Sequence, residues 1–304
     1  MNAILTKREY EKARQFLLTK ARKLEAAQFH YEFEQGSEDE VLRELLRYQN
    51  DDGGFGKGLE PDLRCEESSA LATTTAMQSL VRLTESAIPL IERAMRYFRN
   101  SYSDSGNGWD IIPKEAEQAP RAIWWEYGAF KDNWGNPNAE IAGYFNRFTD
   151  LAGSHGSEFA DRLNGYALRH LRESCDLREM HEMLCYVRWQ ETLPAETRHE
   201  ISGQLDEFVD NCVIADPGDR IGYGGYPLMV VQSTEDRYYS KYADVLPGDL
   251  DRLIESQSAE GCWSPNWAWG RYDEAWETAK MEWQGVLTLQ ALRTLRNFGR
   301  LERN

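Results

Sequence analysis

The stretch QNDDGGFGKGLEPDLR, residues 49–64, decides the predicted fold because part of it recurs downstream as QSAEGCW, residues 257–263. Both copies read as Gln, two residues, an acid, Gly, one residue and an aromatic ring, which is Phe55 or Trp263. Each copy follows one amphipathic helical pattern and precedes another. The repeat therefore predicts a structural unit of helix, aromatic turn and helix. A degenerate third copy, SDSGNGW, lies at 103–109.

Helical periodicity of apolar residues dominates the rest of the chain. No alternation of strands with helices appears, and the apolar run at 228–232 is too isolated to found a sheet. Hairpins of helices that cannot bury their apolar faces alone are expected to stack side by side. The sequence thus predicts an all-α protein, an α/α toroid of about ten to twelve helices forming a single domain over 1–304, with an open solenoid as the alternative. The predicted helices are 5–31, 37–48, 68–84, 87–100, 138–153, 157–173, 177–192, 195–212, 247–257 and 277–299, with short ones near 121–130 and 234–244.

Composition excludes several classes of protein. No apolar run reaches the roughly 18 residues that a membrane span needs, and the N-terminal residues turn charged too early for a signal peptide, so we expect a cytoplasmic protein without stable membrane insertion. The five cysteines are scattered and form no CxxC, which argues against a disulfide framework or a zinc knuckle. A formal net charge of -16 argues against nucleic acid or an anionic membrane surface as the main partner and accommodates a neutral or cationic ligand more easily, with solubility as the alternative role of the acidity. The expected partner is a hydrophobic or neutral small molecule.

The two main turns, each leading into a helix, resemble the QW-type repeats of α/α-toroid terpenoid cyclases and protein prenyltransferase β subunits. The whole chain is similar to uncharacterised bacterial proteins labelled prenyltransferase-like or squalene-cyclase-like, through GGFGKGLEPDLR, NPNAEIAG, HEMLC at 181–185 and GYGGYP at 222–227. The resemblance implies the toroid fold, a turn Gln that caps a neighbouring helix and a turn aromatic that stacks on the next repeat. It implies no particular activity, because one fold hosts several chemistries.

The signature motifs of the cyclases are absent. An enzyme of the squalene-hopene type protonates an alkene with an Asp of a DxDD motif, held neutral and tightly hydrogen-bonded, and no DxDD occurs in this chain. Enzymes that bind diphosphate through Mg²⁺ use a DDxxD run. Asp51 and Asp52 lack the third acid and belong instead to the turn.

The zinc site of protein prenyltransferases is also missing. Its Asp and Cys are mimicked by Asp210 and Cys212, but no His follows His199. His181 and Cys185 share a helix face at i, i+4, yet no third ligand is in sight, and a core-facing polar pair is the favoured interpretation. The sequence therefore predicts no metal and no cofactor.

An acidic group follows the first turn. Glu60 and Asp62 form a Glu-x-Asp pair that, in a cleft, would serve as catalytic general acid and base, as in glycosidases built on α/α barrels. Arg64 would then contact the ligand. The alternative is that the two acids neutralise Arg64 and cap the helix that begins near Ser68, since structural ion pairs also involve carboxylates.

Aromatic residues crowd the irregular segments and are candidates for lining a cavity. Their π faces suit either a polyprene or carbocation or a flat sugar ring, and ordinary packing of the repeats is the alternative. Asn136, Asn138 and the pair His181 and Glu182 are polar groups expected near the same opening. The aromatic candidates are Trp124, Trp125, Trp134, Tyr223, Tyr226, Trp263, Trp267 and Trp276.

Three functions are compatible with these patterns. The leading hypothesis is a terpenoid cyclase-like or prenyltransferase-like protein that binds a hydrophobic, isoprenoid-like small molecule in an aromatic-lined central cavity, with or without transforming it. The second is a carbohydrate-active α/α-barrel enzyme, a glycoside hydrolase or lyase, that uses Glu60 and Asp62. The third is a non-catalytic scaffold whose turns serve stability alone.

Overall fold

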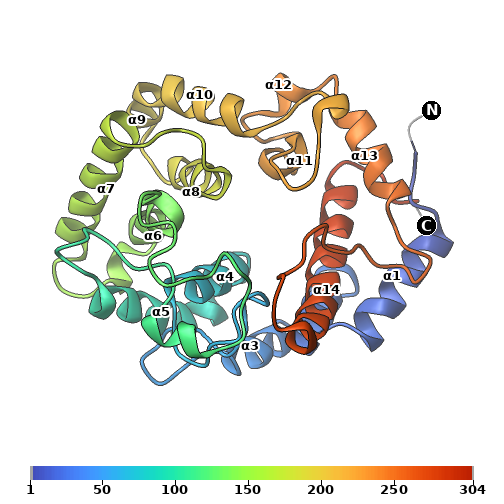
Figure 1. Ribbon diagram of the computed structural model, residues 1–304, viewed down its shortest axis with the longest axis horizontal. Coiled ribbons are helices and arrows are strands. Elements are labelled where there is room, and N and C mark those ends of the chain that lie inside the picture. The colour runs from blue at the N-terminus through green and yellow to red at the C-terminus, as the bar shows by residue number, and fades with distance from the viewer. Residues whose placement is uncertain (1–2, 303–304) are drawn as a thin grey trace. The chain divides into compact units, whose positions relative to one another are not determined.

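The computed structural model describes residues 3–302, and these form α-helices, short 3-10 turns and isolated β-bridges without any strand (Figure 1). This confirms the all-α prediction. The chain divides into two compact units. The continuous unit runs from Leu45 to Cys212, and the discontinuous unit combines the chain up to Glu44 with the chain from Val213 onward. Within the described range, no helix has the length and apolar character needed to cross a bilayer.

The discontinuous unit has a core in which the two ends of the chain meet. The Leu5 amide donates to the Arg300 carbonyl at 2.8 Å, and the Glu302 amide donates to the Leu5 carbonyl at 3.0 Å. Leu17, Phe29 and Leu292 are central core residues. Its helices are α1 (Lys7–Thr19), α2 (Lys23–Phe33), α3 (Glu38–Leu46, which ends in the other unit), α11 (Pro227–Val230), α12 (Tyr239–Tyr242), α13 (Leu246–Glu255) and α14 (Asp273–Asn297).

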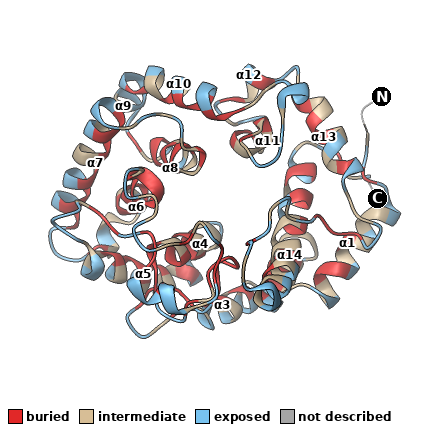
Figure 2. Cartoon of the chain, viewed as in Figure 1, coloured by how far each residue is buried: buried red, intermediate tan, exposed pale blue. Residues whose placement is uncertain are grey.

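The continuous unit is built around one helix that is buried over most of its length. Its helices are α4 (Ala70–Leu80), α5 (Ile88–Ser101), α6 (Gly135–Arg147), α7 (Gly156–Glu173), α8 (Met180–Gln190), α9 (Ala195–Glu200) and α10 (Ser202–Cys212). Helix α5 buries one stripe of apolar residues at helical spacing, as an amphipathic helix does. Helix α6 is buried over most of its length, red in Figure 2, and packs against both α7 and α8. Polar side chains of α6 must therefore find partners inside the protein.

The two main turns have the same hydrogen-bond geometry. In the first, the Gln49 side-chain amide donates to the Gly53 carbonyl at 2.9 Å and to the Leu90 carbonyl of α5 at 3.3 Å. In the second, the Gln257 amide donates to the Gly261 carbonyl at 3.0 Å, and it also reaches the first turn of α1. Each Gln thereby closes its own turn and ties it to the first turn of a neighbouring helix.

The aromatic residue of each turn is tied to the helix that follows. The backbone N–H of Phe55 donates to Thr73 Oγ1 at 2.9 Å, and that of Trp263 donates to Thr288 Oγ1 at 3.1 Å. In the degenerate third copy the backbone N–H of Trp109 donates to Asn138 Oδ1 at 2.8 Å. The repeat seen in the sequence is thus a repeated corner, in which a side-chain oxygen of the next helix fixes the aromatic residue.

Two predicted helices are each divided in the structure. The segment 5–31 breaks between α1 and α2, where Arg22 has an extended backbone with φ -61° and ψ 155°. Ala21 lies at this break close to Gly285 of α14, where an added Cβ would stand 2.8 Å from that of Ala21. The break therefore lets the chain turn against α14. The segment 195–212 divides at Ile201, whose side chain is fully buried. The short helix expected near 234–244 is present as α12, whereas the described residues 121–130 form turns and not the expected helix. With α11 and the two divisions, the described residues contain fourteen α-helices.

Candidate functional site

The acidic segment after the first corner is held beside the tryptophan-rich loop. The Arg64 amide donates to the Pro120 carbonyl at 3.0 Å, and the Ala122 amide donates to the Asp62 carbonyl at 2.9 Å. These bonds flank an isolated antiparallel bridge between Leu63 and Arg121. The structure therefore brings Glu60, Asp62 and Arg64, three predicted site residues, next to the loop that carries Trp124 and Trp125.

We call residues 121–130 the aromatic loop, and Arg121 organises it from the inside. The side chain of Arg121 is buried, and its guanidinium donates to the carbonyl of Trp125 at 2.6 Å. Further bonds run to the Glu117 carbonyl at 2.9 Å, the Ala119 carbonyl at 3.1 Å and Glu126 Oε2 at 2.7 Å. A planar cation with five donors can fix several carbonyls at once, so it holds this irregular backbone without a helix.

Trp125 is buried with an indole N–H that has no acceptor. Only 8% of the residue is exposed, its ring contacts Phe130 at 5.5 Å between centroids, and Nε1 finds no hydrogen-bond partner. In contrast, Nε1 of Trp109 donates to the Phe98 carbonyl at 2.8 Å, and Nε1 of Trp189 donates to a side-chain oxygen at 2.7 Å. A buried donor without an acceptor lowers the free energy of unfolding by roughly 1–3 kcal/mol. The Trp125 N–H is therefore an unfavourable feature of this loop as it stands.

Apolar side chains of the aromatic loop are open to solvent next to Trp125. Ile123 is 59% exposed and Tyr127 is 40% exposed, while Trp124 is half-buried. The acids on the adjoining segment are enclosed, with Glu60 at 8% and Asp62 at 3% exposure. The loop therefore combines exposed apolar surface with an unused buried donor, and the adjoining segment adds two buried acids.

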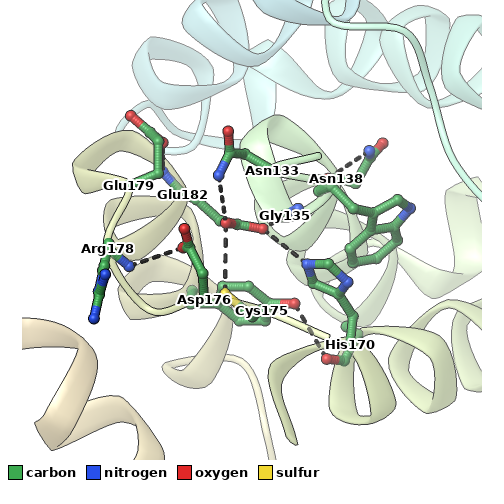
Figure 3. A network of polar contacts seen from close by, with 12 residues as sticks. Asn133, Gly135, Asn138, His170, Cys175, Asp176, Arg178, Glu179 and Glu182 are labelled. Atoms are coloured by element: carbon green, nitrogen blue, oxygen red, sulfur yellow. Dashed lines mark hydrogen bonds and ion pairs between the residues drawn. The ribbon is translucent and has the colours of Figure 1, made fainter. Parts of the chain in front are cut away.

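A second polar centre lies where α6, α7 and α8 meet, and Glu182 is at its middle (Figure 3). The Glu182 carboxylate is fully buried and accepts from the backbone N–H of Gly135 at 2.7 Å and from His170 Nε2 at 3.0 Å. Asn133 Nδ2 lies 3.4 Å from Glu182 Oε2, and Cys175 Sγ lies 3.5 Å from the same oxygen. An imidazole, a thiol and a carboxylate thus face one another.

Local chain geometry places each of these groups. His170 is in the last turn of α7, and its carbonyl accepts from the Cys175 amide at 2.8 Å, which folds the connecting chain back onto the helix end. Glu179 caps α8 by accepting from the Glu182 amide at 2.6 Å. A Cβ on Gly135 would stand 2.5 Å from the ring of Tyr186, so only glycine lets the backbone approach Glu182 this closely.

The other predicted polar residues divide between the third corner and the second centre. Asn138 serves the corner, since its amide also donates to the Trp134 carbonyl at 2.6 Å. Asn136 Oδ1 lies 3.9 Å from Cys185 Sγ, and the Trp134 ring packs against His170 at 5.4 Å. His181 lies apart from them, because its Nδ1 pairs with Glu179 at 2.7 Å while Glu182 on the same helix points inward.

A buried ion pair that the sequence analysis missed adjoins this centre. The Glu140 carboxylate of α6 accepts from Arg188 at 2.9 Å, from the Tyr144 hydroxyl at 2.6 Å and from Gln78 at 3.0 Å. The pKa of Tyr144 is raised well above its usual value, mainly because the hydroxyl is buried and secondly because the Glu140 carboxylate is close. Cys185 has its pKa raised by burial and by the same carboxylate. His181 and Cys185, paired in the sequence analysis, therefore have different partners.

The predicted aromatic residues of the discontinuous unit fall into separate groups. Tyr223 and Trp267 meet edge to face at 5.6 Å, and Trp267 meets Trp283 in the same way at 5.2 Å. Trp276 packs on Trp269 at 5.9 Å. Two others have identifiable structural partners: Tyr226 lies under the guanidinium of Arg220 at 5.2 Å, and Trp263 Nε1 donates to the Leu253 carbonyl at 2.7 Å.

The sequence analysis did not identify three residues whose side chains could bind a ligand or take part in catalysis: Glu140, His170 and Cys175. The available signal was the spacing His-x4-Cys-x6-Glu across the end of one predicted helix and the start of the next. No family model, curated protein or solved structure matches this chain. Its function is therefore argued from the two centres themselves.

Proposed function

We propose that this protein binds a hydrophobic, isoprenoid-like small molecule carrying an oxygen acceptor, at the aromatic loop. The observation that carries the proposal is the buried indole N–H of Trp125, which has no acceptor. An oxygen of a bound ligand would accept this hydrogen bond and remove the desolvation cost. The ligand's apolar part would lie against Ile123, Trp124 and Tyr127, which offer exposed or half-exposed apolar surface.

The negative charge of the protein restricts the chemical class of the proposed ligand further. The chain carries a formal net charge of -16, and Glu60 and Asp62 adjoin the loop. A diphosphate or another free anion would be repelled by this field, whereas an uncharged alcohol or carbonyl compound would not. A neutral prenyl alcohol has the chemistry that the loop would accept: an apolar chain for the aromatic surface and one oxygen for the Trp125 N–H.

We also propose that the helical hairpins are arranged as an α/α toroid of the terpenoid cyclase and prenyltransferase type. Support comes from the equivalent corners, which tie the turn before α4 to α5 and the turn before α14 to α1. Helix α1 thus stands to α14 as α5 stands to α4. The parallel pairing of Leu5 with Leu301 is consistent with a chain whose last hairpin is completed by its first helix.

Ligand binding is tested by titrating the purified protein with farnesol and following intrinsic tryptophan fluorescence, with calorimetry as a second readout. Trp125→Phe removes the N–H and keeps most of the ring, and it is expected to weaken binding about 2- to 12-fold, the value of one hydrogen bond. Trp109→Phe is the matched control, because its N–H already has an acceptor. Saturable binding that Trp125→Phe leaves unchanged, or no binding of farnesol, would contradict the proposal.

A carbohydrate-active enzyme is the second candidate, and the burial of Glu60 and Asp62 beside aromatic side chains favours it. Such an enzyme would use the two carboxyl groups as acid and base and stack a sugar ring on the loop. The wild-type protein should then release reducing sugars from one member of a polysaccharide panel. Glu60→Gln and Asp62→Asn should each abolish that activity. Farnesol should have no effect on the activity of the wild-type protein. Activity that survives both substitutions would exclude this candidate.

A further inference from the structure

We propose that His170, Cys175 and Glu182 bind one divalent transition-metal ion of the zinc type. Within the described residues these three side chains form a group whose ligand atoms all lie within 4.8 Å of one another. The site is independent of the aromatic loop and of the ligand proposed there. Figure 3 shows the imidazole of His170 and the sulfur of Cys175 directed at the same carboxylate.

The distances between the ligand atoms suit a single ion. His170 Nε2 and Glu182 Oε1 are 3.0 Å apart, and Cys175 Sγ and Glu182 Oε2 are 3.5 Å apart. Bonds of about 2.0–2.3 Å in a tetrahedral arrangement place neighbouring ligand atoms roughly 3.3–3.7 Å apart. The ligand atoms of the group lie within 4.8 Å of one another, so side-chain rotation would bring all three to these separations around an ion. The residues come from three adjoining parts of the chain: the end of α7, the α7–α8 connection and the first turn of α8.

Charge gives a second reason for a cation here. Glu182 is fully buried, and no lysine or arginine of the described residues forms an ion pair with it. The buried carboxylate thus has an imidazole, a thiol and neutral amides around it, and no lysine or arginine among its partners in the described part of the chain.

A divalent ion would neutralise this centre. One thiolate and one carboxylate together carry two negative charges, which balance an M²⁺ ion while the imidazole stays neutral. Binding forms the metal–sulfur bond and releases the thiol proton to water. Thiolate and imidazole ligands favour zinc-type ions over Mg²⁺ or Ca²⁺. Three protein ligands leave a fourth position for a water molecule, and the partial exposure of Cys175 provides the side from which an ion enters.

The second coordination shell is also in place. The backbone N–H of Gly135 and the side-chain amide of Asn133 both donate to the Glu182 carboxylate, which fixes the plane of that group. The ring of Trp134 packs against His170 and limits its rotation. Outer contacts of this kind orient metal ligands, and losing one such contact typically lowers metal affinity 10- to 100-fold.

The test is a titration of the metal-stripped full chain with Co²⁺, followed by absorption. One equivalent should produce the near-ultraviolet band of a thiolate bound to Co²⁺ together with tetrahedral d–d bands, and Zn²⁺ should displace both. Cys175→Ser should remove the thiolate band and weaken Co²⁺ binding at least about 100-fold. Cys65→Ser is the matched control, because Cys65 Sγ also faces a carboxylate, Glu67 Oε2 at 2.9 Å, but no imidazole joins that pair. It should leave the spectrum unchanged.

A readout on wild-type protein keeps the test decisive if Cys175→Ser does not fold. Zn²⁺ should slow alkylation of Cys175 at least 10-fold, measured by peptide mass spectrometry, without changing the rate at Cys65. No thiolate band in the wild-type titration, a band of full size in folded Cys175→Ser, or alkylation of Cys175 unaffected by Zn²⁺ would each overturn the proposal.

Discussion

Glycine at two single positions determines whether the main corners can form. Gly53 and Gly261 both have φ of +93°, in the region that side chains rarely adopt. A Cβ on Gly53 would stand 2.3 Å from the Arg93 carbonyl oxygen, and one on Gly261 would stand 2.5 Å from the Lys12 carbonyl carbon. We expect Gly53→Ala and Gly261→Ala each to lower the free energy of unfolding by about 2–4 kcal/mol, measured by urea denaturation, because strain and a backbone clash add together.

Gly128→Ala separates those two causes. Gly128 has φ of +79° but no atom within 4 Å of an added Cβ. Its substitution should therefore show the backbone strain alone, about 1 kcal/mol. If Gly53→Ala were no more destabilising than Gly128→Ala, close approach of the corner to α5 would not be the reason for glycine at 53.

The buried thiol of Cys65 makes a separate prediction about alkaline pH. Burial and the hydrogen bond to Glu67 raise the pKa of Cys65 to about 12. Between the ordinary thiol pKa of about 8.5 and that value, the unfolded chain binds fewer protons than the folded chain, so stability falls as pH rises. Cys65→Ser removes this contribution. The loss of unfolding free energy from pH 8.5 to 10.5 should become shallower by up to about 1.4 kcal/mol per pH unit.

The wild-type protein and Cys65→Ser also provide the control for that measurement, at lower pH. Below about pH 7.5 the thiol is protonated in both states, so the two stability profiles should run parallel there. Lysines and tyrosines titrate equally in both proteins and cancel in the difference. Profiles that stay parallel up to pH 10.5 would show that Cys65 ionises as readily in the folded protein as in the unfolded one.

At the scale of elements, each main corner depends on a hydroxyl of the following helix. Thr73 and Thr288 are fully buried and accept the backbone N–H of Phe55 and Trp263. Thr73→Val and Thr288→Val keep the side-chain shape but leave a buried N–H without an acceptor. We expect each to cost about 1–3 kcal/mol in unfolding free energy, measured by thermal or urea denaturation.

Thr75→Val is the matched control on the same helix α4. The Thr75 hydroxyl donates to the Leu71 carbonyl, one turn earlier, at 3.0 Å. That carbonyl belongs to the helix, so losing the hydroxyl leaves no buried donor unpaired, and the change should stay within about 0.5 kcal/mol. Equal effects at positions 73 and 75 would mean that the corner bond adds nothing beyond ordinary helix side-chain contacts.

Local patterns predicted the corners and most of the helices, but not every helix boundary and not the partners of each element. The Gln, Gly and aromatic spacing predicted the corners, because glycine at positive φ and a short polar turn are local requirements. The division of 5–31 into α1 and α2 was not predicted, since no Gly or Pro marks it and the cause is packing of Ala21 against α14. Tertiary contact overrides helix propensity there.

The candidate site shows the same limit. The sequence analysis placed acids and tryptophans near one another, and backbone pairing of Asp62 with Ala122 joins those segments. It could not foresee that Trp125 would lack an acceptor, which depends on every neighbouring chain segment. It also could not foresee that His170 would face Glu182, because that requires the end of α7 and the start of α8 to be folded against each other.

At the scale of the whole molecule, the pairing of the chain ends has a consequence for connectivity. Leu5 and Leu301 form a parallel bridge. A linker that joins Glu302 to Ala3 must therefore span about three residue rises, roughly 10 Å. A flexible Gly/Ser linker of about ten residues has a root-mean-square span of roughly 17 Å and can join them. Opening the chain between Gly153 and Ser154, which are exposed, would then give a circular permutant with the same contacts.

We expect this permutant to keep the helical circular-dichroism spectrum of the parent and to unfold cooperatively, with a loss of no more than about 2 kcal/mol. A permutant opened between Ala139 and Glu140 is the control, because it cuts the buried helix α6 and should not fold. Joining Glu302 directly to Ala3 without a linker should destabilise the first permutant strongly, since one trans peptide spans only about 3.8 Å between Cα atoms. If the long-linker permutant failed to fold while the parent remained stable, the pairing of Leu5 with Leu301 would not hold the chain ends together in solution.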